Sequence, residues 1–180
     1  LAEALRTSET GGDAGAPPFD WDIAVDIGDL SGGQDVPHDA EGEEVVRQFG
    51  ALQKHRREDI YNICGNHDRS GLDEAPAWWW QKWADPLGAH TAYSGVDPAR
   101  RPYPVQGTWE RYSFSVGNVL FLLMSDINEP SQTIGRGDLG GNPAGVVSGE
   151  TFSWWRRMVE SHPEHIIVTA QDRKSTRLNS

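Results

Sequence analysis

YNICGNHD, residues 61–68, is the stretch that decides the fold class and the candidate site of this chain. Its first half, 61–64, is short and mostly apolar and is closed by a glycine, which predicts a buried strand. Three complementary side chains follow: the amide oxygen of Asn66, the titratable ring of His67, and the carboxylate of Asp68, which can orient that ring. Open α/β sheets place their sites at such strand ends. A turn with a surface histidine is the plainer interpretation.

An upstream stretch has the same organisation. Residues 23–27 (IAVDI) indicate another short buried strand, which Gly28 closes, and Asp29 follows directly. A carboxylate held rigidly behind a strand suits a bridging metal ligand, because its oxygens must face two cations at once. The same pattern is also typical of a simple turn or helix cap, so both interpretations stay open on this stretch alone.

The segments between and beyond these strands alternate between helix and strand patterns. Apolar residues recur at helical spacing over 45–52, and the basic residues 54–57 follow, an order that suits a helix dipole. A Gly-Asn dipeptide at 117–118 joins two strand-like runs, which predicts a hairpin. Further predicted elements are a helix over 78–83, a helix over 152–159, a strand over 165–169, and irregular loops over 10–19 and 85–108. Together these patterns indicate an α/β fold.

The order of Gly-Asp at 28–29, a helix, and Gly-Asn-His-Asp at 65–68 resembles the calcineurin-like metallophosphoesterase family. The pattern of that family runs Asp-x-His, Gly-Asp, Gly-Asn-His-Asp/Glu, a single histidine and Gly-His-x-His. Residues 110–126 also resemble the family's hairpin, and residues 149–160 the helix before its single-histidine strand. The resemblance covers about residues 20–170 and implies a metallophosphoesterase-type layered α/β/β/α sandwich, here incomplete.

The resemblance also implies a chemistry. Asp29 would bridge two divalent metal ions (Mn, Fe or Zn), and Asn66 would ligate one of them. His67 would lie beside the leaving-group oxygen, with Asp68 holding its ring. The implied reaction is hydrolysis of a phosphomonoester or phosphodiester by a hydroxide that the two metals activate. General acid–base help from a residue such as His67 typically contributes about 10²–10⁴-fold to the rate.

The chain departs from the family pattern at both ends. No Asp-x-His precedes Asp29, no Gly-His-x-His is found, and Gln171 stands where the family has its single histidine. We hypothesise that a native histidine codon was altered there, because residues 172–180 (DRKSTRLNS) resemble a translated sequencing adapter. Residues 1–171 are therefore expected to form a partial domain, followed by a non-native tail. Such a chain should bind metals poorly and be close to inactive.

Composition narrows the possible partners. The formal net charge of −11 disfavours general nucleic-acid binding and binding to anionic membranes. The expected substrate, a small phosphoester, is what the family resemblance implies. No apolar run is long enough for a membrane span. The single cysteine, Cys64, excludes an internal disulfide framework and is expected to be buried. Composition leaves the compartment, cytoplasmic or exported, and the oligomeric state open.

Other candidate residues favour structural interpretations. The tryptophans in 78–83 are expected to pack in the core or a lid, although a platform that stacks on a sugar or base is the alternative. Residues 126–129 form a turn or shape the substrate cleft. Surface or loop positions are expected for His38, His55, His90, His162 and His165. Two functions rival the enzyme: a non-catalytic binding module on the same scaffold, and a Trp-rich glycan-binding protein.

Overall fold

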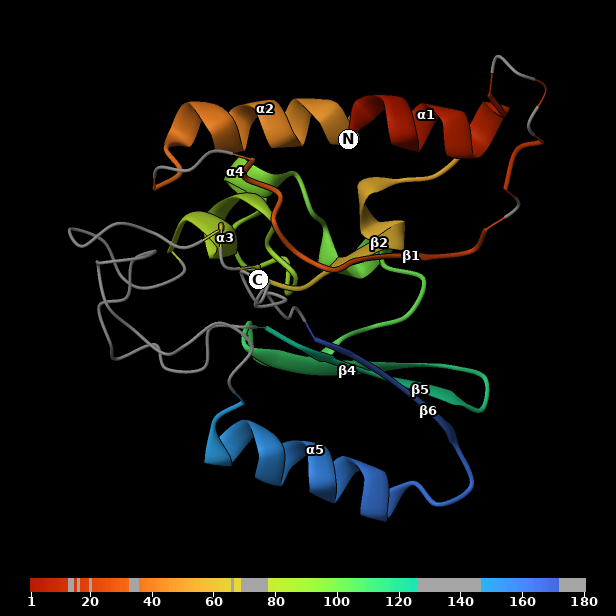
Figure 1. Ribbon diagram of the computed structural model, residues 1–180, viewed down its shortest axis with the longest axis vertical. Coiled ribbons are helices and arrows are strands. Elements are labelled where there is room, and N and C mark those ends of the chain that lie inside the picture. The colour runs from red at the N-terminus through yellow and green to blue at the C-terminus, as the bar shows by residue number, and fades with distance from the viewer. Residues whose placement is uncertain are drawn as a thin grey trace, which may run out of the picture.

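The computed structural model describes most of the chain as a mixed α/β fold (Figure 1). The described residues are 1–12, 15, 17–19, 21–32, 36–65, 67–68, 78–125 and 147–171. Within them the strands form two small sheets, and several helices cover these sheets. None of the helices in these ranges is long and apolar enough to cross a membrane.

The first sheet contains the two strands that precede the candidate motifs. Strand β1 (Ala24–Asp26) runs parallel to β2 (Ile60–Asn62), and Asp26 lies opposite Asn62 in the register. Helix α2 (Asp39–Phe49) connects them, which confirms the predicted strand–helix–strand unit. Unlike the prediction for residues 23–27, β1 is half-buried rather than buried.

The second sheet has the strand order β3-β4-β5-β6. The bounds are β3 Gln106–Gly107, β4 Arg111–Val116, β5 Val119–Met124 and β6 Ile166–Gln171. The β4–β5 pair is the predicted hairpin: Val116 lies opposite Val119, and Gly117 adopts a left-handed φ of 58° in the turn. Strand β6 pairs in parallel with β5, and its residues are half-buried or exposed.

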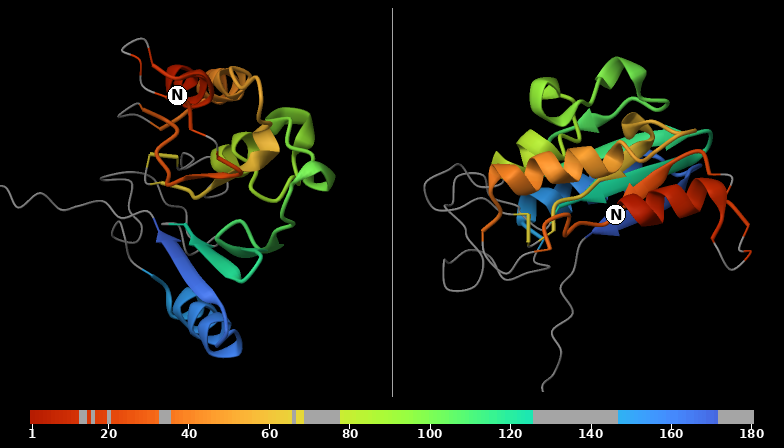
Figure 2. Two further views of the ribbon diagram at one scale, coloured as in Figure 1. Left: turned by 90° about the vertical axis from the view of Figure 1, so that its right-hand side faces the viewer. Right: turned by 90° about the horizontal axis from the view of Figure 1, so that it is seen from above.

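The elements stack in four layers (Figures 1 and 2). Helix α1 (Ala2–Thr10) and α2 lie over the first sheet, the second sheet lies beneath it, and α5 (Gly149–Ser161) covers the opposite face of the second sheet. Ser148 caps α5 by accepting a 3.1 Å hydrogen bond from the Thr151 N–H. The indole of Trp155 donates to the Thr169 hydroxyl at 3.0 Å, which ties α5 to β6.

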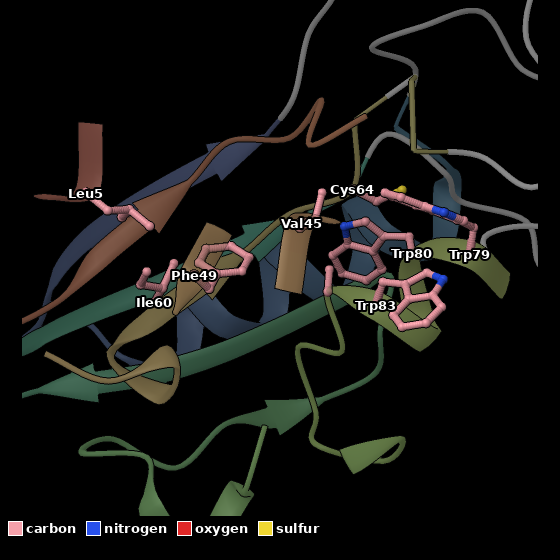
Figure 3. Close-up of a cluster of buried hydrophobic side chains, with 9 residues drawn as sticks. Leu5, Val45, Phe49, Ile60, Cys64, Trp79, Trp80 and Trp83 are labelled. Carbon is pink, nitrogen blue, oxygen red and sulfur yellow. The ribbon is translucent and has the colours of Figure 1, made fainter. Parts of the chain in front are cut away.

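One hydrophobic cluster packs the helical layer against the first sheet (Figure 3). Helix α3 (Trp78–Trp83) contributes Trp79, Trp80 and Trp83, each at most 5% exposed, and α2 contributes Val45 and Phe49. Their burial confirms that these tryptophans pack in the core. Cys64 also belongs to this cluster and is buried, as predicted.

A second cluster fills the space between the two sheets. It brings Tyr61 and Ile63 from the β2 segment against Tyr112 and Phe114 of β4. The Tyr61 and Phe114 rings stack with their centroids 3.9 Å apart. The hydroxyl of Tyr112 donates to the Asn62 carbonyl oxygen at 2.7 Å, so the sheets are joined by a polar contact as well as by apolar packing.

Two local predictions need correction, and one helix was not predicted. The basic residues 54–57 lie beyond the end of α2, because the chain turns out of the helix at Gly50, so they do not complement its dipole. Helix α1 is absent from the predicted elements, since it buries little apolar surface and is anchored instead by Glu9. The stretch 85–108, predicted to be irregular, contains regular elements: α4 (Thr91–Ser94), a 3₁₀ turn (Pro98–Arg100) and β3.

Candidate functional site

The candidate site forms where the carboxyl ends of β1 and β2 meet. Because these strands are parallel and Asp26 pairs with Asn62, the segments that follow them leave the same edge of the sheet. The main-chain N–H of Ile63 donates to the Asp26 carbonyl at 3.0 Å and extends this pairing. The two motifs predicted from sequence, 28–29 and 65–68, therefore start side by side.

Glycine is required at both motifs because the two backbones nearly touch. A Cβ added to Gly65 would lie 2.3 Å from the Asp29 nitrogen, and one added to Gly28 would lie 2.7 Å from the Gly65 Cα. Asp29 itself has a left-handed φ of 59°, which is uncommon for a residue with a side chain. A contact this close holds Asp29 in a fixed position against the second loop.

Asp29 is bonded directly to the Gly-Asn-His-Asp loop. The main-chain N–H of His67 donates to Oδ1 of Asp29 at 2.9 Å. Asn66 lies outside the described residues, but its two chain neighbours, Gly65 and His67, both lie against Asp29. The Asp29 residue is exposed, so a carboxylate fixed on one side by this bond also faces solvent.

Asp68 joins the two loops from inside. Its side chain is 0% exposed, and its oxygens accept hydrogen bonds from the main-chain N–H groups of Asp29 (3.0 Å), Gly65 (2.9 Å) and Ser31 (2.9 Å). Hydrogen bonds to a charged group contribute about 1.5–3 kcal/mol each. Asp68 thus positions both motifs, a role that the sequence did not indicate. Its expected bond to the His67 ring stays a prediction.

Two carboxyl groups lie beneath the site, the buried Asp68 and the half-buried Asp26. Burial raises the pKa of Asp68 to about 7, although the Ser31 and Gly65 amides oppose the shift and the charge of Asp26 adds to it. Burial likewise raises the pKa of Asp26 to about 6, against a 2.8 Å hydrogen bond from the side-chain amide of Asn62. A cation bound nearby would favour the charged form of both groups.

Sequence reasoning missed Asp26, Asn62 and Ser31. The available signal was a carboxylate inside an apolar strand, since such a group has to find a polar partner in the fold. Ser31 is buried, and its hydroxyl donates to Glu41 of α2 at 3.0 Å. A cavity of about 390 Å³ lies beside it, but Glu41 and Glu44 line that cavity and would repel a phosphate group.

The ends of three strands gather around this edge. The main-chain N–H of Cys64 donates to the Ser125 hydroxyl at 3.0 Å, and Met124, the residue before Ser125, pairs with Gln171 at the end of β6. Gln171 occupies the position where the family resemblance expects a histidine ligand. Its Nε2 is buried and has no hydrogen-bond partner in the described structure. Residues 126–129 and 172–180, the predicted cleft turn and tail, lie outside the described ranges.

Two histidines that were expected at surface or loop positions, His38 and His55, make structural contacts. His38 caps α2 through a 3.4 Å contact from the Glu41 N–H. His55 lies in a loop, as expected, but its side chain is only 15% exposed and its ring stacks on Trp21. Within the described ranges, no group of three or more His, Cys, Asp or Glu residues is placed to hold a metal ion. Among the described residues, Asp29 is the carboxylate that the family resemblance assigns as a metal ligand.

Comparison with known proteins gives no match: no family model, no curated protein and no solved structure is similar to this chain. The likeness to metallophosphoesterases therefore consists of the two motifs and the order of the elements around them. A functional conclusion has to come from the geometry of the residues themselves.

Proposed function

We propose that this chain carries part of the site of a metal-dependent phosphoester hydrolase of the calcineurin-like metallophosphoesterase type. The observation that supports it is the 2.9 Å hydrogen bond from the His67 N–H to Oδ1 of Asp29, which joins the Gly-Asp and Gly-Asn-His-Asp motifs. The four-layered arrangement agrees with a metallophosphoesterase-type sandwich. The substrate class is a phosphomonoester or phosphodiester.

Each residue has a role in this proposal. Asp29, exposed and fixed by the second loop, would hold divalent ions together with Asn66. Such ions, when bound, neutralise phosphate oxygens and lower the pKa of water. The His67 ring would protonate the leaving oxygen. Asp68 would keep both loops in place through its three amide contacts.

The described residues fit a metal only in part. The carboxylate of Asp29 and the amide oxygen of Asn66, a residue outside the described ranges, are together fewer ligands than a firmly held divalent ion takes from protein and water. Gln171 lies at the end of β6, where the resemblance expects a histidine, and of its side-chain amide only the oxygen could coordinate a cation. We therefore expect this chain to bind Mn²⁺ weakly and to hydrolyse bis-p-nitrophenyl phosphate little above background.

Paramagnetic line broadening detects such weak binding residue by residue. Titration with Mn²⁺ should broaden the amide NMR signals of Gly65 and His67 before those of other residues, because the effect falls steeply with distance. Asp29→Asn should remove this broadening. Asp22→Asn is the matched control, since Asp22 is an exposed carboxylate in the loop before β1. Broadening that is absent from the wild type, or unchanged in Asp29→Asn, would overturn the proposal.

A second function, a non-catalytic binding module on the same scaffold, is favoured by the missing three-ligand cluster among the described residues. A module that has lost its metal site gives no site-specific broadening in the same titration. The glycan-binding alternative has less support, since Trp79, Trp80 and Trp83 are buried in the core and their rings cannot stack on a sugar.

A further inference from the structure

A second cavity lies near the opposite end of β2 from the candidate site. Its volume is about 300 Å³, within the lower range of small-molecule sites. The end of α2, the loop that leads into β2, and the segment around residues 94–100 form its walls. The walls are apolar at Val46, Phe49 and Leu52 and basic at Arg56, Arg57 and Arg100.

Arg57 forms the inner wall, and its guanidinium donates hydrogen bonds to main-chain carbonyl groups. It donates to the Ile60 carbonyl at 3.3 Å and to the Ala84 carbonyl at 2.6 Å, and its guanidinium lies 4.0 Å from the centre of the Phe49 ring. Among the described residues no carboxylate forms an ion pair with it. Burial and the neighbouring Arg101 lower the pKa of Arg57 to about 10, which still leaves it charged at neutral pH.

Arg101 adds a second positive charge behind the same wall. It is buried, and it donates to the carbonyls of Glu58 (3.0 Å), Ile60 (3.1 Å) and Pro86 (3.0 Å). Carbonyl oxygens satisfy the donors of a guanidinium but carry no net charge to cancel its own. The positive charges of Arg57 and Arg101 therefore lie close together here, opposed by the charges of Asp26 and Asp85, in a chain whose formal net charge is −11.

Arg56 and Arg100 stand at the mouth of the cavity. Their side chains are 46% and 54% exposed. Arg56 pairs with Asp59 at 3.2 Å, and Arg100 is 3.8 Å from the Glu58 carboxylate, too far for a hydrogen bond. The lining of the cavity contains one acidic residue, Glu58, and three arginines. Half-exposed guanidinium groups can turn toward a ligand, and their planar fork matches a carboxylate or phosphate.

We propose that this cavity is a binding site for a small organic anion, whose phosphate or carboxylate group meets Arg56 and Arg100 and whose apolar body lies against Phe49 and Leu52. The buried charges of Arg57 and Arg101 attract the anion without contacting it. The site is separate from the Asp29 loop and needs no metal. A test of anion binding here is therefore independent of the proposed hydrolase activity.

The test is an NMR titration with phenylphosphonate, a dianion with an apolar ring and a phosphorus–carbon bond that a phosphoesterase does not cleave. It is carried out in the presence of a chelator, so that the metal site does not contribute. Saturable shifts are expected at Gly50, Ser94 and Gly95, which line the cavity. Benzyl alcohol, which has a similar ring and no charge, should give no saturable shift at these residues.

Variants distinguish direct contacts between the arginines and the anion from a general electrostatic attraction. Arg100→Gln should weaken phenylphosphonate binding about tenfold or more, because a charge-assisted hydrogen bond is lost. Arg56→Gln should do the same, which guards against a folding defect in either variant. Arg47→Gln is the matched control: Arg47 is exposed on α2 and does not line the cavity.

Three results would overturn the proposal. The first is an absence of saturable shifts around the cavity in the wild-type protein. The second is equal affinity for the wild type and for both cavity variants, which would mean that these arginines only hold the backbone. The third is binding of benzyl alcohol as tightly as phenylphosphonate, which would show that the charge contributes nothing.

Discussion

Glu9 and His55 are joined twice, although 46 residues separate them: Oε1 of Glu9 accepts the main-chain N–H of His55 at 2.8 Å and lies 2.7 Å from its ring Nδ1. The same carboxylate accepts the main-chain N–H groups of Gln53 (2.7 Å) and Lys54 (3.1 Å). Glu9 is 0% exposed, so these contacts replace its hydration completely. They anchor α1 to the loop that follows α2.

Glu9→Gln should therefore destabilise the protein. The variant keeps the size of the side chain but loses one acceptor oxygen and the charge, and its new NH₂ group faces main-chain donors. We expect a loss of about 1–3 kcal/mol in the free energy of unfolding, the usual cost of a buried unsatisfied polar group. Urea unfolding measures it. Glu3→Gln, an exposed position on the same helix, is the control and should change stability little.

The contribution of Glu9 should also depend on pH. Burial alone would raise its pKa, but the hydrogen bonds from Gln53, His55 and Lys54 outweigh burial and lower the pKa to about 2 from 4.5. A depressed pKa means that the folded state favours the charged form, so the stabilisation is complete above about pH 4.5 and disappears as the pH falls toward 2. The stability difference between wild type and Glu9→Gln should shrink over that interval. A difference that stays constant or grows would contradict this assignment.

Asp68→Asn should loosen the candidate site. Only one oxygen would remain for three N–H donors, so at least one of the amides of Asp29, Ser31 and Gly65 would lose its acceptor. We expect a loss of about 1–3 kcal/mol in stability and faster hydrogen exchange at these amides. Asp22→Asn provides the control at an exposed position. Unchanged exchange at all three amides would show that Asp68 does not hold the loops together.

Gly65→Ala should separate the two motifs. Its Cβ would lie 2.3 Å from the Asp29 nitrogen, so the loops must move apart at a cost of about 1–3 kcal/mol, as for other overpacked positions. Gly32→Ala is a matched control in the neighbouring loop, because a Cβ there meets no atom within 4 Å. Thermal unfolding compares the two variants. Equal melting temperatures would mean that the close approach at residue 65 is not required.

Local sequence patterns were enough to locate many of the elements. The Gly-Asn turn at 117–118 predicted the β4–β5 hairpin, and helical spacing predicted α2, α3 and α5. The two Gly-containing motifs were also placed correctly after strands β1 and β2. These predictions succeed because turn chemistry and hydrophobic periodicity act between residues close in the chain.

Contacts between distant segments decided the rest. Helix α1 has few apolar residues to reveal it, and it is held by the bonds from Glu9 to residues 53–55. Asp68 was expected to serve the neighbouring His67, yet two of the three described bonds to its carboxylate cross 37 and 39 residues to Ser31 and Asp29. The sequence alone determined which groups can bond and how the chain alternates between helix and strand. The tertiary structure decided which donors meet each buried carboxylate, because a buried charge binds the amides that the fold brings to it, however far away they lie in the chain.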